Sequence, residues 1–187
     1  KLRSDETKER IAAAARKLFA DNGYERTTIR AVAAEANIDP AMIMRYFGSK
    51  EGLFATVANF DLRLPDLSAL PHEKLGERLV RHVLDRWENT EEDSLVILLR
   101  AASSNEAARE RMRDVFRSQV LPAISRIMPD PRRAAVAAEL IGSQIIGLAF
   151  CRFVLQLPLL GGTDTAQIIE RIGAVIQMHL DEFSTSR

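Results

Sequence analysis

The chain has 187 residues, 47% of them hydrophobic, which is enough for one sizeable core or two small domains that share one. Its 26 basic and 26 acidic residues give zero net charge, so the bulk balance favours neither nucleic acid as a partner nor an acidic tail. The distribution is uneven. Residues 1–50 hold 10 Lys or Arg against 7 Asp or Glu, and residues 51–187 hold 16 against 19. A DNA-binding end with an acidic remainder shows this asymmetry, as do many ordinary proteins.

The single cysteine, Cys151, lies in the apolar run GLAFCRFVLQL and predicts a buried structural thiol without an internal disulfide. No run approaches about 18 uninterrupted apolar residues, and the N-terminus is polar, so neither a membrane span nor secretion is expected. We therefore expect a cytoplasmic protein without a membrane partner. Because the chain begins at Lys1 without methionine, some native N-terminal residues are expected to be missing.

Helical periodicity dominates the sequence, which predicts an all-α fold. The first helix is expected over about 5–22, and Gly23 follows it as a left-handed stop. Its apolar residues fall on one stripe, formed by Ile11, Ala14, Ala15, Leu18 and Phe19.

Two short helices are expected next. Thr27 or Thr28 caps the first, and its stripe is Ile29, Val32, Ala33 and Ala36. After a turn, Asp39 caps the second, with Pro40 at the first helical position, so this helix covers about 40–46. Gly48 ends it. A helix beginning near Ser49 is then expected to run to about Leu64, because Pro65 follows.

The segment RLPDLSALPHEK contains two prolines and marks the expected internal boundary. Beyond it, periodicity predicts five helices, over about 73–88, 91–102, 106–128 (disturbed at Pro122), 132–157 and 165–183.

Residues 28–47 fit a helix-turn-helix, in which two short amphipathic helices meet at a tight turn and the second enters the major groove. Ala33 and Ala36 let the two helices approach closely, while Ile29, Val32, Ile38, Ile43 and Phe47 can close a small core with the first helix. A plain helical hairpin satisfies much of the same pattern.

The run AARKLFADNGYERTTIRAVAAEANIDPAMIMRYFGSKEGLF resembles the DNA-binding domain of the TetR family of transcriptional regulators over about residues 8–62. The resemblance implies a nine-helix homodimer with a three-helix DNA-binding domain (1–50) and an effector-binding and dimerisation domain (51–187). It implies a regulator, by the family's usual mode a repressor, that binds a palindromic double-stranded DNA operator and is released by a small-molecule effector. The mostly apolar residues expected to line the pocket suggest an apolar or amphipathic effector, although a regulator without an effector would show the same pattern. No cofactor, metal site or enzymatic activity is expected.

The resemblance also assigns roles to residues. Thr28 would contact phosphate and Arg30 would reach a base. Pro40, Ala41, Met42 and Met44 stand where the family contacts bases, and Arg45 and Tyr46 stand where it contacts phosphates. Lys50 would clamp phosphate together with a helix N-terminus. Asn37 replaces the family's usual glycine, and because asparagine tolerates the left-handed conformation the turn is kept. Met44 replaces the family's common tyrosine and removes a hydroxyl, so base recognition by this helix would depend on thymine methyl groups, water and DNA shape.

In the C-terminal half, small residues along 132–157 permit close approach, and 165–183 has a wide apolar sector. The resemblance implies that both helices pair with their copies. The expected dimer residues are Ala138, Gly142, Ile145, Ile168, Ile172, Val175 and Ile176. The alternative is that both faces are covered within one chain.

An effector pocket would lie among the helices between about 49 and 157. The candidate lining residues are Phe60, Trp87, Leu95, Leu99, Met112, Phe116, Phe150 and Phe153, and the candidate polar anchors are His82, Asn105 and Gln144. Each of these could instead be ordinary core or surface.

An enzyme and a protein-binding adaptor are the two alternative function classes. An enzyme finds no support, because His72, His82 and His179 are far apart in sequence and no metal, nucleophile or phosphate-loop motif occurs. A protein-binding helical adaptor would use the last two helices without DNA.

Overall fold

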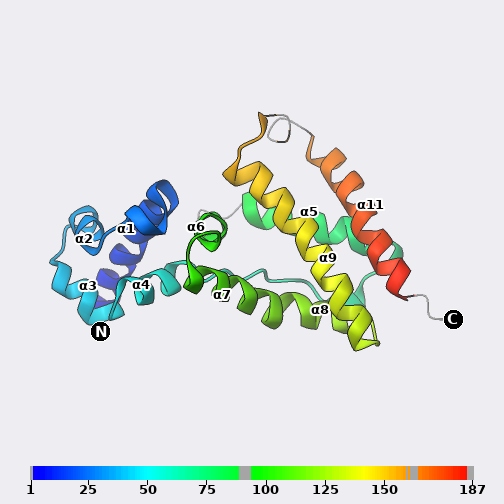
Figure 1. Cartoon of the computed structure of the whole chain (residues 1–187), viewed down its shortest axis with the longest axis horizontal. Coiled ribbons are helices and arrows are strands. Elements are labelled where there is room, and N and C mark those ends of the chain that lie inside the picture. Colours follow the sequence, from blue (N-terminus) through cyan, green and yellow to red (C-terminus); the bar gives the residue numbers. More distant parts are fainter. Residues whose placement is uncertain (1, 89–93, 159, 161–163, 185–187) are drawn as a thin grey trace. The chain divides into compact units, whose positions relative to one another are not determined.

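The computed structural model describes residues 2–88, 94–158, 160 and 164–184, and within them every regular element is helical (Figure 1). The predicted all-α class is therefore confirmed. The chain forms two compact units, of which unit 1 comprises Lys1–Phe60 and Glu91–Arg113, and unit 2 comprises Asp61–Thr90 and Asp114–Arg187. This division by compactness does not follow the functional boundary expected after residue 50, which stays a prediction.

Unit 1 is built on the long helix α1 (Leu2–Arg26). Against it pack α2 (Ile29–Ala36), α4 (Lys50–Val57) and α6 (Ser94–Ala102), while α3 (Pro40–Phe47) packs between α2 and α4. Helix α7 (Glu106–Val115) begins in this unit. The large side chains that are fully buried here include Ile11, Phe19, Ile43, Leu53 and Phe54.

The ends of the short helices follow the predicted capping chemistry. Thr28 caps α2 by accepting the Ala31 N–H, Asp39 caps α3 with Pro40 in its first turn, and Asn37 lies in the left-handed region at φ 51°. Thr27 is instead buried, and its hydroxyl donates to the carbonyls of Leu18 and Gly23. The first threonine therefore holds the end of α1, and the second begins α2.

Gly23 breaks α1 where a stop was expected, at φ 76° and ψ 172°. This positive φ favours glycine, but the ψ lies outside the left-handed helical region that was predicted. After this break the helical hydrogen bonding continues to Arg26.

The predicted extension of the fourth helix to about Leu64 is wrong, because α4 ends at Val57. The following chain alternates between buried and exposed residues: Ala58, Phe60 and Leu62 are buried, and the residues between them are exposed. That period of two suits an extended segment. The Leu62 N–H donates to Oε1 of Gln119 at 2.7 Å, and the Leu62 carbonyl lies 2.9 Å from Nε2 of His82. Side chains therefore satisfy backbone groups that a helix would have paired internally.

Unit 2 contains α5 (Leu75–Glu88), α8 (Leu121–Ser125), α9 (Pro131–Ala149) and α11 (Thr165–Ser184). Helix α11 packs on both α5 and α9, and α8 packs on α9 (Figure 1). At the crossing of α5 and α11, a Cβ on Gly76 would lie 2.1 Å from the Gly173 carbonyl oxygen. Two glycines thus let these backbones touch, which fixes the position of α11 on α5.

Two long helical stretches contain irregular turns. The 106–128 stretch is disturbed near Pro122 as expected: a π-helical turn, Phe116–Val120, precedes α8, which ends at Ser125. Helix α9 passes into a second π-helical turn, Phe150–Val154, and helical conformation is lost before Leu157, because Gln156 has φ 52°. Short 3-10 turns at Leu67–Ala69 and His72–Lys74 precede α5. Residues 91–93 of the predicted sixth helix lie outside the described residues.

By length and composition alone, one described stretch, Pro131–Val154, is apolar enough to cross a membrane, which the sequence analysis did not anticipate. Its inner face contributes Ala134, Ala137, Ala138 and Ile141 to the core of unit 2. A core helix of a soluble protein passes the same test, so the feature is weak evidence for a membrane. Only 33% of the apolar window is buried, however, which leaves much of α9 uncovered within one chain.

Candidate nucleic-acid interface

Helix α3 exposes a small and mostly apolar surface. The Asp39 carboxylate accepts the Ala41 N–H at 2.7 Å and fixes the start of the helix. Ile43 is fully buried and anchors the inner side, while Met44 is 47% exposed on the outer side. An exposed methionine beside Pro40 and Ala41 can meet an apolar feature such as a thymine methyl group, but it cannot donate a hydrogen bond.

The nine residues predicted to contact DNA all belong to unit 1, and none is buried. The exposed ones are Thr28, Arg30, Pro40, Ala41, Met44 and Arg45, and the half-buried ones are Met42, Tyr46 and Lys50. The structure therefore places the whole set on the surface of one unit, while their contacts with DNA stay a prediction.

Three basic residues of unit 1, Arg30, Arg45 and Lys8, are available near the ends of its helices. Arg30 makes no hydrogen bond or ion pair within the described part of the chain. The Arg45 guanidinium carbon and the Lys8 ammonium each lie 5.6 Å from the centroid of the Tyr46 ring. Sequence reasoning missed Lys8, because nothing in its position on α1 indicates that it approaches the end of α3.

Arg10 is a second residue that sequence reasoning missed. Its guanidinium donates to the carbonyl oxygens of Ala36 and Asn37, at 2.6 and 3.3 Å, where α2 ends. A cation there satisfies orphan carbonyls and complements the helix dipole. Lys17 forms a further tie between α1 and α2, with its ammonium 2.6 Å from the carboxylate of Glu35. These contacts hold the turn of the helix-turn-helix against α1.

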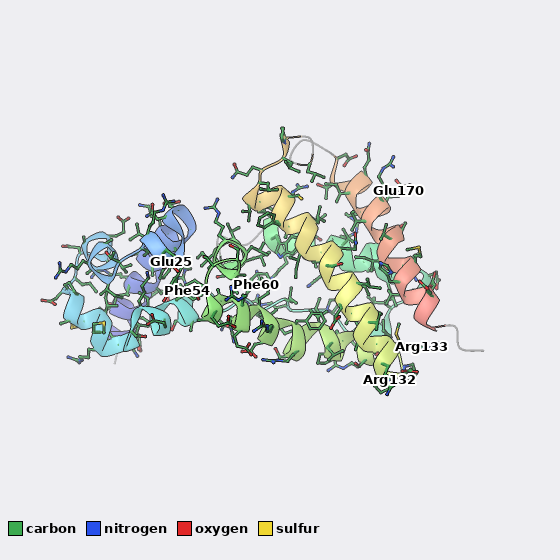
Figure 2. The ribbon with its side chains drawn as sticks, in the orientation of Figure 1. Glu25, Phe54, Phe60, Arg132, Arg133 and Glu170 are labelled. Carbon is green, nitrogen blue, oxygen red and sulfur yellow. The ribbon has the colours of Figure 1, made fainter. Side chains whose placement is uncertain are left out.

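Lys50, at the start of α4, lies over an aromatic ring. Its ammonium is 4.2 Å from the centroid of Tyr24 and 3.4 Å from the Glu25 carbonyl oxygen. The Tyr24 hydroxyl donates to the Glu51 carboxylate at 2.9 Å. Figure 2 labels Glu25, at the end of α1, and Phe54, on α4, which border this cluster.

The charge states of this cluster follow from its surroundings. Burial raises the pKa of Tyr24 to about 12, and the hydrogen bond to Glu51 adds to the shift, whereas Asn105 acts in the opposite sense. The pKa of Glu51 is lowered chiefly by its own backbone N–H and next by the Tyr24 hydroxyl. At neutral pH the phenol is therefore a neutral donor and Glu51 an ionised acceptor.

Gly52 fixes how α4 meets α3. A Cβ at this position would lie 2.1 Å from the Phe47 carbonyl oxygen, which is too close for any side chain. Ser49 caps α4 by accepting the Gly52 N–H at 3.0 Å. The short distance between the last carbonyl of α3 and the first turn of α4 therefore sets the position of Lys50 relative to α3.

The residues expected at a dimer interface are mostly covered within one chain. Ala138, Ile168 and Ile176 are buried in the core of unit 2, and Gly142 is buried with the Phe116 ring next to it. Ile145, Ile172 and Val175 are partly exposed. The buried members cannot meet a second copy directly, so their proposed role is limited to supporting the surface.

Another face of α9 is exposed and apolar, and its residues were not among those expected at a dimer interface. Val136, Leu140 and Phe150 are 46%, 37% and 37% exposed, and their spacing places them on one stripe with Ser143 and Gly147. A Cβ on Gly147 would meet nothing within 4 Å. We call these five residues the α9 stripe. The signal was present in the sequence, but small residues facing the core were mistaken for the outer face.

The candidate effector residues are divided between the units. Phe60, Leu95, Leu99, Asn105 and Met112 belong to unit 1, and His82, Trp87, Phe116, Gln144, Phe150 and Phe153 to unit 2. The structure brings Trp87 and Phe153 together, edge to face, with ring centroids 5.7 Å apart. Two polar anchors already have structural partners: His82 contacts Leu62, and Asn105 caps α7 through the Ala108 N–H.

Helices α2 and α3 meet at a tight turn against α1, and α3 is capped, partly exposed and accompanied by basic side chains. This arrangement defines a helix-turn-helix DNA-binding protein. Comparison with known proteins agrees with this class. The family model "Bacterial regulatory proteins, tetR family" matches residues 11–57, and "Tetracyclin repressor-like, C-terminal domain" matches residues 73–180. The chain belongs to the TetR family of transcriptional regulators.

Among curated relatives, the HTH-type transcriptional regulator HbdR of Aromatoleum sp. (strain CIB) is 43% identical over 56 residues, which are 29% of this chain and 24% of HbdR. The match thus spans about a quarter of that relative's length. Among solved structures, NalD of Pseudomonas aeruginosa, the secondary repressor of the MexAB-OprM multidrug efflux pump, has a TM-score of 0.72 at 22% identity and covers 96% of this chain and 98% of NalD. The SmeT–triclosan complex has a TM-score of 0.66 at 20% identity, with 97% and 93% covered.

These likenesses confirm the predicted family and the TetR-like architecture, and they identify the chain as a DNA-binding regulator. Homodimers and responses to ligands are typical of the family, whose members are soluble proteins. The family models that match are those of transcriptional regulators.

Proposed function

We propose that the chain is a repressor that binds a palindromic operator as a homodimer and releases it when a small apolar or amphipathic effector binds. The observation that carries this proposal is that the nine predicted DNA contacts all belong to unit 1 and none is buried, with six of them on the capped helix α3. The domain division at residue 50, the dimer and the effector are parts of the same proposal.

On the operator, α3 recognises bases by shape and apolar contact rather than by charged side chains. Met42 and Met44, with Pro40 and Ala41, contact base edges and thymine methyl groups, and Arg30 supplies a directed hydrogen bond to a base. Thr28, Arg45, Tyr46 and Lys50 contact phosphates and set the register of the helix. The Thr28 hydroxyl, which accepts from the Ala31 N–H, still has its proton free to donate to a phosphate.

The homodimer forms through the α9 stripe. Exposed apolar side chains at a helical spacing favour a second apolar surface, and Gly147 lets two helices approach closely. Partly exposed residues of α11, Ile172 and Val175, extend this surface. A two-fold dimer places two recognition helices on successive major grooves, so the half-sites lie about one turn apart, ~34–36 Å.

The effector binds in unit 2 beside Trp87. The indole Nε1 of Trp87 is buried and has no hydrogen-bond partner among the described residues, although Phe153 covers an edge of the ring. A ligand with an apolar body and one hydrogen-bond acceptor would satisfy that donor. The similar fold of SmeT, solved in complex with triclosan, supports a small-molecule response.

The signal passes along the extended segment after α4. Gln119 in a π-helical turn and His82 on α5 hold Leu62, so a shift of either element moves the chain that leads back to α4 and Lys50. In this proposal the dimer has two conformations, one that binds the operator and one that does not. An effector can release DNA in this way only if it binds the second conformation better than the first.

A gel-shift titration of the full chain against DNA that flanks its own gene tests the proposal. We expect salt-sensitive binding to a palindrome at nanomolar protein, with random DNA of the same length bound much more weakly. Equal affinity for palindromic and random DNA at every salt concentration would contradict a sequence-specific regulator. Absence of binding at low salt would favour the adaptor.

A further inference from the structure

In the proposed function the Lys50 ammonium binds a DNA phosphate, and we call this contact the phosphate clamp. Lys50 has no carboxylate within ion-pair distance among the described residues. Its ammonium lies over the face of the Tyr24 ring, 4.2 Å from the centroid. A cation over an aromatic face is attracted to the ring but keeps its N–H groups available for other partners. The ammonium is thus held in place and still able to bind an anion.

The Tyr24 ring is itself rigidly held. Tyr24 is 7% exposed, and its ring stacks on Phe19 at a centroid distance of 5.8 Å. The Phe54 ring meets it edge to face at 4.9 Å. Because both neighbours are fully buried, the surface beneath Lys50 belongs to the core of unit 1 rather than to a mobile side chain.

The hydroxyl of the same tyrosine has a second effect. It donates to the Glu51 carboxylate at 2.9 Å, and Glu51 is the residue directly after Lys50. A free carboxylate there could pair with the ammonium or repel a phosphate. The phenol gives Glu51 another partner and draws its charge toward α1.

We propose that Tyr24 is the positioning residue of the phosphate clamp: its ring holds the Lys50 ammonium ready for a DNA phosphate, and its hydroxyl keeps Glu51 from competing for that ammonium. This inference rests on the proposed role of Lys50 in DNA binding. Tyr24 does not touch the DNA and acts only through its two neighbours.

The test measures the affinity of the protein for its palindrome and for random DNA across a range of salt concentrations. Lys50→Ala sets the scale, because each lost phosphate contact lowers the slope of log K against log salt by about 0.9. Tyr24→Leu removes the ring, and we expect it to weaken both DNAs and lower the slope as Lys50→Ala does. In the Lys50→Ala background, Tyr24→Leu should add less than about a twofold change.

Tyr24→Phe separates the hydroxyl from the ring and preserves the aromatic packing. We expect Tyr24→Phe to weaken DNA binding less than Tyr24→Leu does, and Tyr24→Phe with Glu51→Gln to restore it, because the amide carries no competing charge. Circular dichroism and thermal melting of each variant check that unit 1 stays folded. If Tyr24→Leu does not fold, the phenylalanine variant and its rescue decide the question.

Several outcomes overturn the inference. If Tyr24→Leu and Lys50→Ala are additive, or if the tyrosine variants leave the salt slope unchanged, Tyr24 is only a packing residue. Failure of Glu51→Gln to rescue Tyr24→Phe removes the role of the hydroxyl. If wild-type protein binds the palindrome but Lys50→Ala changes nothing, the clamp and this inference fail while the regulator stands. If wild-type protein binds no DNA, the proposed function itself fails.

Discussion

The exposed surface around α3 and the α9 stripe both present large apolar side chains to solvent, but in different surroundings. Met44 on α3 is 47% exposed, and the residue after it is the exposed Arg45. Val136 and Leu140 on α9 are comparably exposed, and their stripe continues through Ser143, Gly147 and Phe150 without a charge. A single exposed apolar side chain next to a cation is compatible with DNA, which offers phosphates and thymine methyl groups. A continuous apolar stripe is compatible with a second apolar surface.

The largest expected effect comes from a charge placed in the α9 stripe. Leu140→Asp should separate the dimer, because a carboxylate buried at an apolar interface has no partner. Two linked DNA-binding domains bind about 10²–10⁴ times more tightly than one, so operator affinity should fall by a comparable factor when the dimer separates. Sedimentation velocity and operator titration measure the two effects.

The matched control for that variant is Glu170→Arg, which reverses an exposed charge on α11 (Figure 2). It should leave both the dimer and operator affinity nearly unchanged. A monomeric Leu140→Asp protein with wild-type operator affinity would show that the α9 stripe has no part in DNA binding.

One glycine in each unit allows the roles of the α3 surface and the α9 stripe to be tested separately. At both Gly52 and Gly76 a Cβ would lie 2.1 Å from a backbone oxygen. Alanine at either position should destabilise its unit by about 1–3 kcal/mol or more, because rigid backbone must shift. Gly52→Ala should weaken operator binding and keep the dimer, and Gly76→Ala should lower the melting temperature of unit 2. Identical losses of dimer and DNA binding in both variants would contradict separate roles for the two surfaces.

The smallest expected effects concern single contacts within the reading surface. Arg30→Ala should relax base preference at one position of each half-site, at a cost of about 1–3 kcal/mol for the specific site only. Lys50→Ala should weaken all sequences alike and lower the salt slope by about 1 per chain. Binding selections with randomised half-sites distinguish them. Equal effects of both variants on specific and random DNA would refute this division.

Features that depend on local chemistry could be predicted from the sequence. Thr28, Asp39 and Ser49 cap helices through bonds to amides two or three residues away, and Asn37 adopts the left-handed conformation that its short polar side chain tolerates. The motif could therefore be located, and family models match residues 11–57 and 73–180.

Features that depend on distant partners could not be predicted. The extended segment after Val57 is satisfied by Gln119 and His82, which come later in the chain. Arg10 reaches the end of α2 across 26 residues. On α9, small residues were expected to face a second copy, but Gly142 lies against Phe116 of the same chain. Periodicity shows that a helix has two faces, and only the fold shows which one is covered.

The spacing of the two half-sites is a direct test of a homodimer that reads two successive major grooves, because binding to both half-sites requires the α3 surface and the dimer at once. Operator affinity is measured for the palindrome and for the same DNA with 5 base pairs inserted between the half-sites, which turns one half-site to about the opposite side of the duplex. The account predicts a loss on the order of 10²-fold or more with the insertion, because only one head can then bind. Unchanged affinity would contradict a homodimer that reads two successive major grooves.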